Sequence, residues 1–292
     1  MLDLLLRNWL HNAAKQKLYE AASQAARERM SQSGEPGPSE PEARTRPCDV
    51  GLVFALGSEA GGLEDRLDGV VNLQASEFKL KQGGLNGRHV VLVLSGAGRE
   101  AAAKATRILI AGHQPQWVVA AGFASGMQPQ LKRGDIVMAD ELCDTAGTRL
   151  SLDLKVPPEA LAALPHVHVG RLLTVRRVVR LPAEKRSLAQ EHQALACDLE
   201  SLGVAEVCRQ ERVRCLAIRV IRDTVDDELP ADVNHLVRQK SAAGMLGAAV
   251  GALVNRPAGI KELLKLKEDS LVFSDRLARF LEDVIAQLAP RP

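Results

Sequence analysis

The stretch Cys215–Asp227, CLAIRVIRDTVDD, carries more information about the fold than any other part of the chain. An apolar, β-branched run ends abruptly at Arg222 and Asp223, and more acid follows. This pattern predicts a buried strand that delivers a carboxylate at its carboxyl end, where open α/β folds place ligands and catalytic groups. Asp223 is therefore the first candidate for chemistry.

Strand and helix patterns alternate before this stretch. Short apolar runs at Val50–Leu56, His89–Leu94 and Trp117–Ala121 each end in glycine-containing turns, and Arg99–Ala111 has helical composition. Further strands are predicted at 135–139, around 170–173 and at 216–221. The chain is therefore expected to form an α/β fold with three αβα layers around a mixed, largely parallel twisted sheet.

Two glycine turns follow these strands, Ser95–Arg99 (SGAGR) and Gly122–Gly126 (GFASG). Backbone N–H groups at Gly98 and Gly122 could approach an anion or a ribose hydroxyl at a helix start. Such turns are equally common at plain strand-to-helix corners, so the pattern alone leaves both interpretations open.

Three acidic candidates have the same ambiguity. Glu59 lies just beyond the first strand, and it is either a surface loop residue or a functional acid. Asp198 and Glu200 precede an apolar helical pattern, where acids also occur simply as helix-start residues.

Both ends of the chain differ from this central part. Residues 1–30 are predicted to form an amphipathic helical extension that packs on its own domain or a partner subunit, with shallow contact to a membrane surface as the lesser alternative. Residues 31–47, rich in Pro, Gly, Ser and Glu, are predicted to be a flexible linker. The catalytic domain is expected to span 48–292, with an insert at about 242–267 before a last helix at Asp275–Leu288.

Composition narrows the classes of function. The chain has 292 residues, 46% hydrophobic and 25% charged, with a net charge of +2, so nucleic acid is not an expected partner. Five scattered cysteines without a CxxC pair indicate a reduced, cytoplasmic setting. We expect no metal or other cofactor, because His166 and His168 lack a third ligand at a suitable spacing and are expected to be solvated loop residues. Cys197 is not expected to be a nucleophile, because it lacks a histidine base.

The order of the blocks resembles the nucleoside phosphorylase superfamily, and within it the methylthioadenosine/S-adenosylhomocysteine nucleosidases. The matching blocks are VGLVFALGSEAGGL, SGAGREAAAKAT, PQWVVAAGFASGMQPQLKRGDIVMADE, ACDLESLGVAEVC and VIRDTVDD. Together they cover roughly Val50–Leu229. The resemblance implies a homodimer acting on a small-molecule nucleoside.

Roles for single residues follow from the same resemblance. It implies that Asp223 protonates the leaving purine, Glu59 activates water, and Glu200 binds the ribose hydroxyls with Leu199 beside it. Gly98 and Gly122 are the matching glycines. Inverting glycosidases work in the same way: one carboxyl group protonates the leaving group, and another activates water on the opposite side of the sugar.

The sequence departs from the nucleosidases at the base site. Arg222 replaces a common serine, and Val178 and Val179 stand where a phenylalanine would stack on adenine. The expected reaction is hydrolysis, because Glu59 would repel phosphate and no arginine lies in Gly57–Gly62. The alternatives are phosphorolysis, possibly of a lipid-linked (hopanoid-type) nucleoside, and a non-catalytic nucleoside-binding scaffold.

Overall fold

The computed structural model of the chain describes residues 47–152, 154, 156, 158–230 and 259–288. All of these belong to one compact unit, Arg46–Pro292. The predicted amino-terminal helix, the predicted linker up to residue 46, and residues 242–258 of the predicted insert lie outside the described residues.

The central element is a ten-stranded sheet. Its strands are β1 Val50–Phe54, β2 Asp68–Ala75, β3 Phe78–Leu85, β4 Arg88–Leu94, β5 Trp117–Gly126, β6 Ile136–Asp144, β7 Arg149–Ser151, β8 Val167–Thr174, β9 Ala196–Asp198 and β10 Arg214–Asp223. The helices are α2 Gly57–Glu64, α3 Arg99–His113, α4 Pro158–Ala162, α5 Pro182–His192, α6 Ser201–Gln210 and α9 Gly259–Gln287.

The sheet is mixed, and its central strands are parallel. β1 pairs in parallel with β4 and β5, and β5 pairs in parallel with β10. β10 also pairs with β6, which continues through β8 and β9 back to β5, so this part of the sheet closes on itself. The predicted α/β class with a mixed sheet is confirmed, and the closed portion is a feature that the sequence pattern did not indicate.

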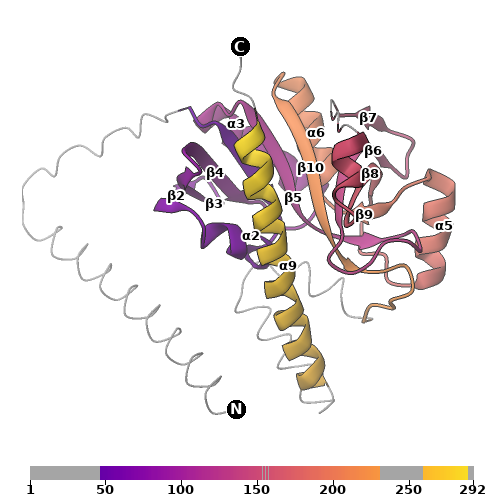
Figure 1. The fold of residues 1–292 in the computed structure, drawn as a ribbon. Coiled ribbons are helices and arrows are strands. Elements are labelled where there is room, and N and C mark those ends of the chain that lie inside the picture. Colours follow the sequence, from indigo (N-terminus) through magenta and orange to yellow (C-terminus); the bar gives the residue numbers. More distant parts are fainter. Residues whose placement is uncertain (1–46, 153, 155, 157, 231–258, 289–292) are drawn as a thin grey trace, which may run out of the picture. The chain divides into compact units, whose positions relative to one another are not determined.

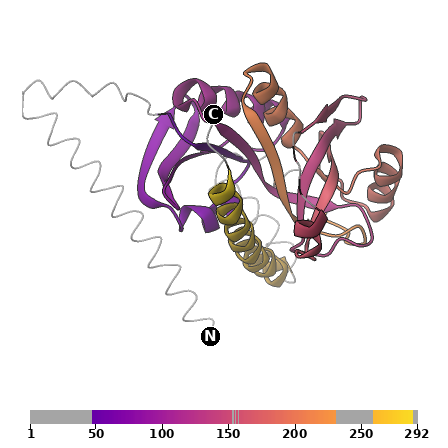
Figure 2. The same ribbon diagram turned by 45° about the horizontal axis from the view of Figure 1, so that its top comes forward.

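Helices cover both faces of the sheet, and alternate residues of each strand serve the two faces. Leu52 and Phe54 of β1 pack in the core shared with α2 and α9, whereas Val53 packs in the core shared with α3 and α6. Figures 1 and 2 show α9 running across one face beside the strands. Each helix layer therefore buries one side of the same strands.

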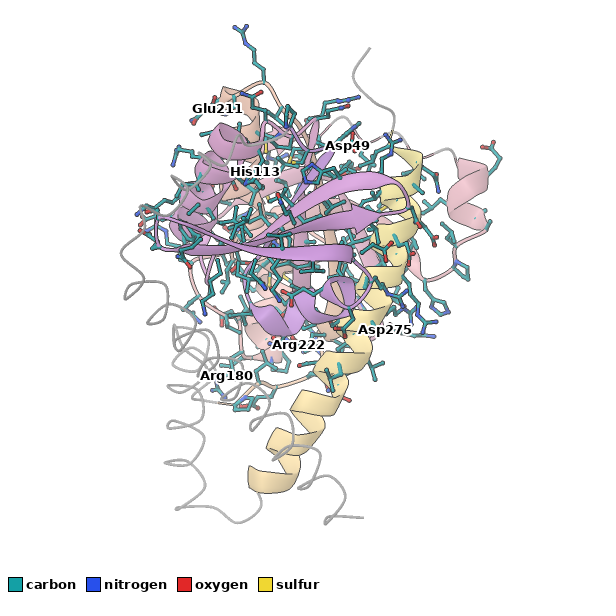
Figure 3. The ribbon with its side chains drawn as sticks, turned by 90° about the vertical axis from the view of Figure 1, so that its left-hand side faces the viewer. Asp49, His113, Arg180, Glu211, Arg222 and Asp275 are labelled. Atoms are coloured by element: carbon teal, nitrogen blue, oxygen red, sulfur yellow. The ribbon has the colours of Figure 1, made fainter. Side chains whose placement is uncertain are left out.

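Parallel pairing brings the carboxyl ends of β1, β4, β5 and β10 to one end of the sheet. The segments that follow or finish these strands carry Glu59, Gly98, Ser125 and Asp223. Figure 3 shows Arg222 at this end and Asp49 and His113 at the opposite end. The candidate residues are thus assembled by topology, as expected for ligand sites in open α/β sheets.

The structure corrects two boundaries. The predicted turn Gly122–Gly126 is wrong, because β5 continues to Gly126 and Gly122 lies within the strand with φ of +154°. The last helix begins at Gly259 instead of Asp275, so it includes residues 259–267 of the predicted insert. The antiparallel hairpin of β2 and β3 was also missed.

Candidate active site

Glu59 is a buried acid in the first turn of α2, and not a surface loop residue. Its Oε2 accepts hydrogen bonds of 3.0 Å from the backbone N–H groups of Ala55 and Leu56. Its Oε1 accepts one of 3.0 Å from the N–H of Phe123 in β5. The carboxylate therefore satisfies donors at a helix amino end and joins β1, α2 and β5 at the floor of the site.

Glu200 is buried immediately before α6. Its Oε1 accepts a hydrogen bond of 2.9 Å from the N–H of Gly98, which makes the first glycine turn part of the site. Burial raises the pKa of Glu200 to about 8, with Arg219 opposing the shift and Asp198 and Glu59 adding to it. Asp198, Glu59 and Glu200 thus share the charge of Arg219, and Glu200 keeps its proton to a higher pH than an ordinary glutamate.

Arg219 lies in the middle of β10 and was not among the predicted residues. Its Nη2 lies 2.6 Å from Asp198 Oδ2 and 3.7 Å from Glu200 Oε2, and it also donates to Ser201 Oγ at 3.0 Å. Burial disfavours its charge, but Asp198, Glu200 and Glu59 outweigh this, so the pKa of Arg219 is raised.

One nitrogen of this guanidinium stays available. Arg219 Nη1 is buried and has no hydrogen-bond partner among the described residues. A Cβ at Gly122 would lie 2.3 Å from this nitrogen and 2.9 Å from Glu59 Oε1. Gly122 therefore leaves room for Arg219 beside Glu59, which is a structural role different from the predicted ligand-binding turn.

Asp223 ends β10 and is buried. Its Oδ1 accepts a hydrogen bond of 3.1 Å from Ser125 Oγ, and its Oδ2 accepts one of 2.6 Å from Lys185 Nζ. Arg222 Nε lies 3.8 Å from Oδ1. The acid predicted from the strand end is therefore held on both sides, by β5 and by α5.

A single pocket connects these groups. Six predicted site residues line it: Glu59, Val178, Val179, Leu199, Glu200 and Arg222. Ser125 and Phe123 also line it, and Phe123 supplies an aromatic ring whose centroid lies 6.3 Å from that of Phe273. Asp223 is not among the lining residues, but its Oδ1 contacts Ser125 and Arg222, which are. Gly98 reaches the pocket through its bond to Glu200.

Three residues that are not expected to take part in the chemistry, Cys197, His166 and His168, have surroundings that explain them. Burial raises the pKa of the Cys197 thiol, which disfavours the thiolate that a nucleophile would need. His166 Nδ1 and His168 Nε2 lie 3.2 and 3.1 Å from the two oxygens of Asp135. His168 lies in β8, so it is a strand residue and not the loop residue expected.

This architecture defines a class: an α/β protein with a layered mixed sheet and a pocket lined by acids at the carboxyl ends of its central strands. The sequence profile of the phosphorylase superfamily matches residues 49–254. The chain belongs to this superfamily.

Similar proteins agree with that assignment. A 5'-methylthioadenosine/S-adenosylhomocysteine nucleosidase of Tolumonas auensis is 25% identical over 228 residues, covering 70% of this chain and 99% of the relative. The crystal structure of the nucleosidase of that name from Campylobacter jejuni has a TM-score of 0.63 at 17% identity, covering 82% of this chain and 100% of that one. A Neisseria meningitidis nucleosidase in complex with methylthio-immucillin-A has a TM-score of 0.61 at 20% identity, covering 84% and 100%.

Proposed function

We propose that this protein hydrolyses the N-ribosidic bond of a purine nucleoside, and that its substrate is a 5'-substituted adenosine of the methylthioadenosine or S-adenosylhomocysteine type. The observation that carries the proposal is that Glu59 and Glu200 line one pocket and that Asp223 binds Ser125 in the wall of the same pocket, although the three acids come from distant parts of the chain. The activity named for the relatives supports the same reaction.

Glu59 is proposed to activate water. As water attacks C1′ of the ribose, its proton passes to the carboxylate of Glu59. Arg219 Nη1 lies near Glu59 across Gly122, and the charge of Arg219 attracts the Glu59 carboxylate and helps to hold it in place. The packing of Gly122 against both side chains keeps this geometry fixed.

Asp223 is proposed to act at the other end of the breaking bond. The electron pair of the C1′–N9 bond moves onto the purine, and protonation at N7 makes the base a better leaving group. Ser125 holds Asp223 Oδ1 on the side of the pocket. Glu200 accepts hydrogen bonds from the ribose hydroxyls, which fixes the sugar between Glu59 and Asp223.

The charges around the pocket favour water over phosphate as the acceptor. Among the described residues that line it, the acids are Glu59, Asp198 and Glu200, and the cation is Arg222. Buried Arg219 is already shared by Asp198 and Glu200. A phosphate anion would therefore meet repulsion beside Glu59 that a water molecule does not meet.

The expected assembly and location are part of this proposal. We infer a homodimer in the cytoplasm, which sedimentation velocity and cell fractionation would test. Among the described residues, no helix combines the length and apolar character that a membrane span requires. Contact of residues 1–30 with a membrane surface stays a prediction that vesicle binding can test.

The decisive experiment measures release of free base from methylthioadenosine, S-adenosylhomocysteine, adenosine and inosine, with and without phosphate. We expect phosphate-independent release of adenine from the 5'-substituted nucleosides and a loss of about 10² to 10⁴-fold in Asp223→Asn. Asp226→Asn is the matched control, because the Asp226 side chain is 73% exposed and pairs with Arg186. Release that requires phosphate would replace hydrolysis with phosphorolysis, and no release from any nucleoside would favour the scaffold alternative.

A further inference from the structure

Lys185 is a buried cation that the proposed reaction has not yet used. It lies in α5, its side chain is 0% exposed, and lysine is rarely buried unless it is paired. Nζ donates to Asp223 Oδ2 at 2.6 Å, to the carbonyl of Thr224 at 2.7 Å and to the carbonyl of Asp227 at 2.9 Å. All three hydrogens of the ammonium group therefore have acceptors.

The two oxygens of Asp223 face different surroundings. Oδ2 faces Lys185, whereas Oδ1 faces Ser125 and Arg222, which line the pocket. Because Lys185 binds Oδ2, the Oδ1 edge of the carboxyl group faces the residues that line the pocket. The rotation of Asp223 is thereby restricted by a residue that does not itself line the pocket.

Lys185 also binds the loop after Asp223, through the carbonyls of Thr224 and Asp227. Further contacts join this loop to the segment that carries Val178 and Val179. The Leu229 N–H donates to the Arg180 carbonyl at 3.1 Å, and Arg180 Nη1 donates to the Leu229 carbonyl at 3.2 Å. Arg186 forms an ion pair with Asp226. Figure 3 shows Arg180 and Arg222 at the same end of the molecule. The acid and the wall formed by Val178 and Val179 are therefore held as one unit.

We propose that Lys185 is the positioning residue of the acid: it holds Asp223 by Oδ2 so that the Oδ1 edge serves the leaving base. This inference rests on the proposed function. It adds no step to the reaction. The proton reaches the base from the Asp223 carboxyl group, and Lys185 acts only through that group.

The test compares two leaving groups on the same 5'-substituted sugar. A purine needs a proton as it departs, whereas 4-nitrophenolate departs without one. In Lys185→Met we expect kcat for the nucleoside to fall by about 10² to 10³-fold, with kcat for the 4-nitrophenyl glycoside changed by less than about threefold.

Controls separate positioning from folding. Lys104→Met removes an exposed lysine that pairs with Glu77, and it should change neither substrate. Lys185→Arg keeps a cation and should recover part of the loss. Equal losses with both leaving groups would overturn the role of Lys185.

If Lys185→Met does not fold, Lys185→Met combined with Asp223→Asn removes both buried charges and is compared with Asp223→Asn alone. A residue that acts through Asp223 should add no further loss of nucleoside activity, and an additional loss contradicts the proposal. Failure of the proposed function is recognised separately, because the unchanged protein would then release no base from any nucleoside.

Discussion

Glu200 is the residue at which electrostatics has the clearest consequence for binding. It is buried beside Asp198 and Glu59 with only part of the Arg219 charge available to it, and its pKa is raised to about 8. A protonated carboxyl group has lost one acceptor for ribose hydroxyls, whereas the anion can accept from both. Substrate binding should therefore depend on pH in the neutral to alkaline range.

We predict that KM falls as pH rises through about 8, by roughly tenfold, the value of one hydrogen bond to a charged group. Stability should fall as pH rises, although substrate binding becomes tighter. A raised folded-state pKa stabilises the fold fully below the unfolded value of 4.5, and that contribution is lost as pH rises through about 8.

Steady-state kinetics between pH 6 and 9 and thermal unfolding over the same range would measure both effects. Glu200→Gln, which cannot ionise, is the control and should flatten the pH dependence of KM and reduce that of stability. A KM that is independent of pH in the unchanged protein would show that Glu200 is already ionised at neutral pH.

Residues of the site differ in how far sequence can predict them. Asp223 was predictable because a carboxylate after an apolar β-branched run marks a strand end. Arg219 lies inside that same run, and its charge was the available signal: a cation within a buried strand requires acids around it. Lys185 had no such signal, because α5 is rich in charged residues and only the tertiary fold places this one beside Asp223.

Strand β5 sets the spacing between Glu59, the proposed general base, and Arg219. The sequence pattern ended this strand at a glycine turn, because glycine usually marks a chain reversal. The structure instead uses Gly122 for close approach inside a parallel strand, where its missing side chain leaves space for Arg219 Nη1 and Glu59 Oε1. Glycines of these two kinds look the same in a single sequence.

Gly122→Ala should therefore impair both stability and activity. Its new Cβ would lie 2.3 Å from Arg219 Nη1, and Arg219 is held by Asp198 and Ser201, so the guanidinium has little freedom to yield. We expect a loss of about 1–3 kcal/mol of unfolding free energy from overpacking. We also expect kcat to fall by about 10²-fold, because the new methyl group would displace Arg219 and Glu59.

The matched control is Gly61→Ala in α2. A Cβ there meets no atom within 4 Å, so the substitution should leave kcat unchanged and raise helix stability, by about 0.5–1 kcal/mol. Urea unfolding and steady-state kinetics would distinguish the two. Normal activity in Gly122→Ala would show that Arg219 does not need its observed position.

At the scale of the whole molecule, the site depends on a sheet covered on both faces. The alternation of strand and helix segments along the chain predicted the layers, but it could not predict that β5, β10, β6, β8 and β9 close into a ring, because closure depends on pairings between distant segments. The start of α9 was also misplaced. The helix begins at Gly259, two residues after Pro257, whereas the sequence pattern predicted its start at Asp275.

The carboxyl-terminal helix α9 packs against α2, the helix that carries Glu59. Leu277, Leu281 and Ile285 recur every four residues on α9 and are all 0% exposed, in the core that also contains Ala60 and Leu63 of α2. Ser274 Oγ accepts from the Gly62 N–H at 2.8 Å and donates to the Glu59 carbonyl at 3.0 Å. Loss of α9 packing should therefore reach the helix that carries Glu59.

Leu277→Ala tests this dependence. Truncation of a fully buried leucine should cost about 2–5 kcal/mol of unfolding free energy, because the cavity cannot be filled by neighbouring side chains. Leu271→Ala, on the same helix but 64% exposed, should stay within about 0.5 kcal/mol. Urea unfolding followed by circular dichroism measures both, and a single cooperative transition in Leu277→Ala is expected because α9 belongs to the shared core. A separate early transition, with the rest of the molecule unchanged in stability, would instead show that α9 is an independent appendage and that α2 keeps Glu59 in place without it.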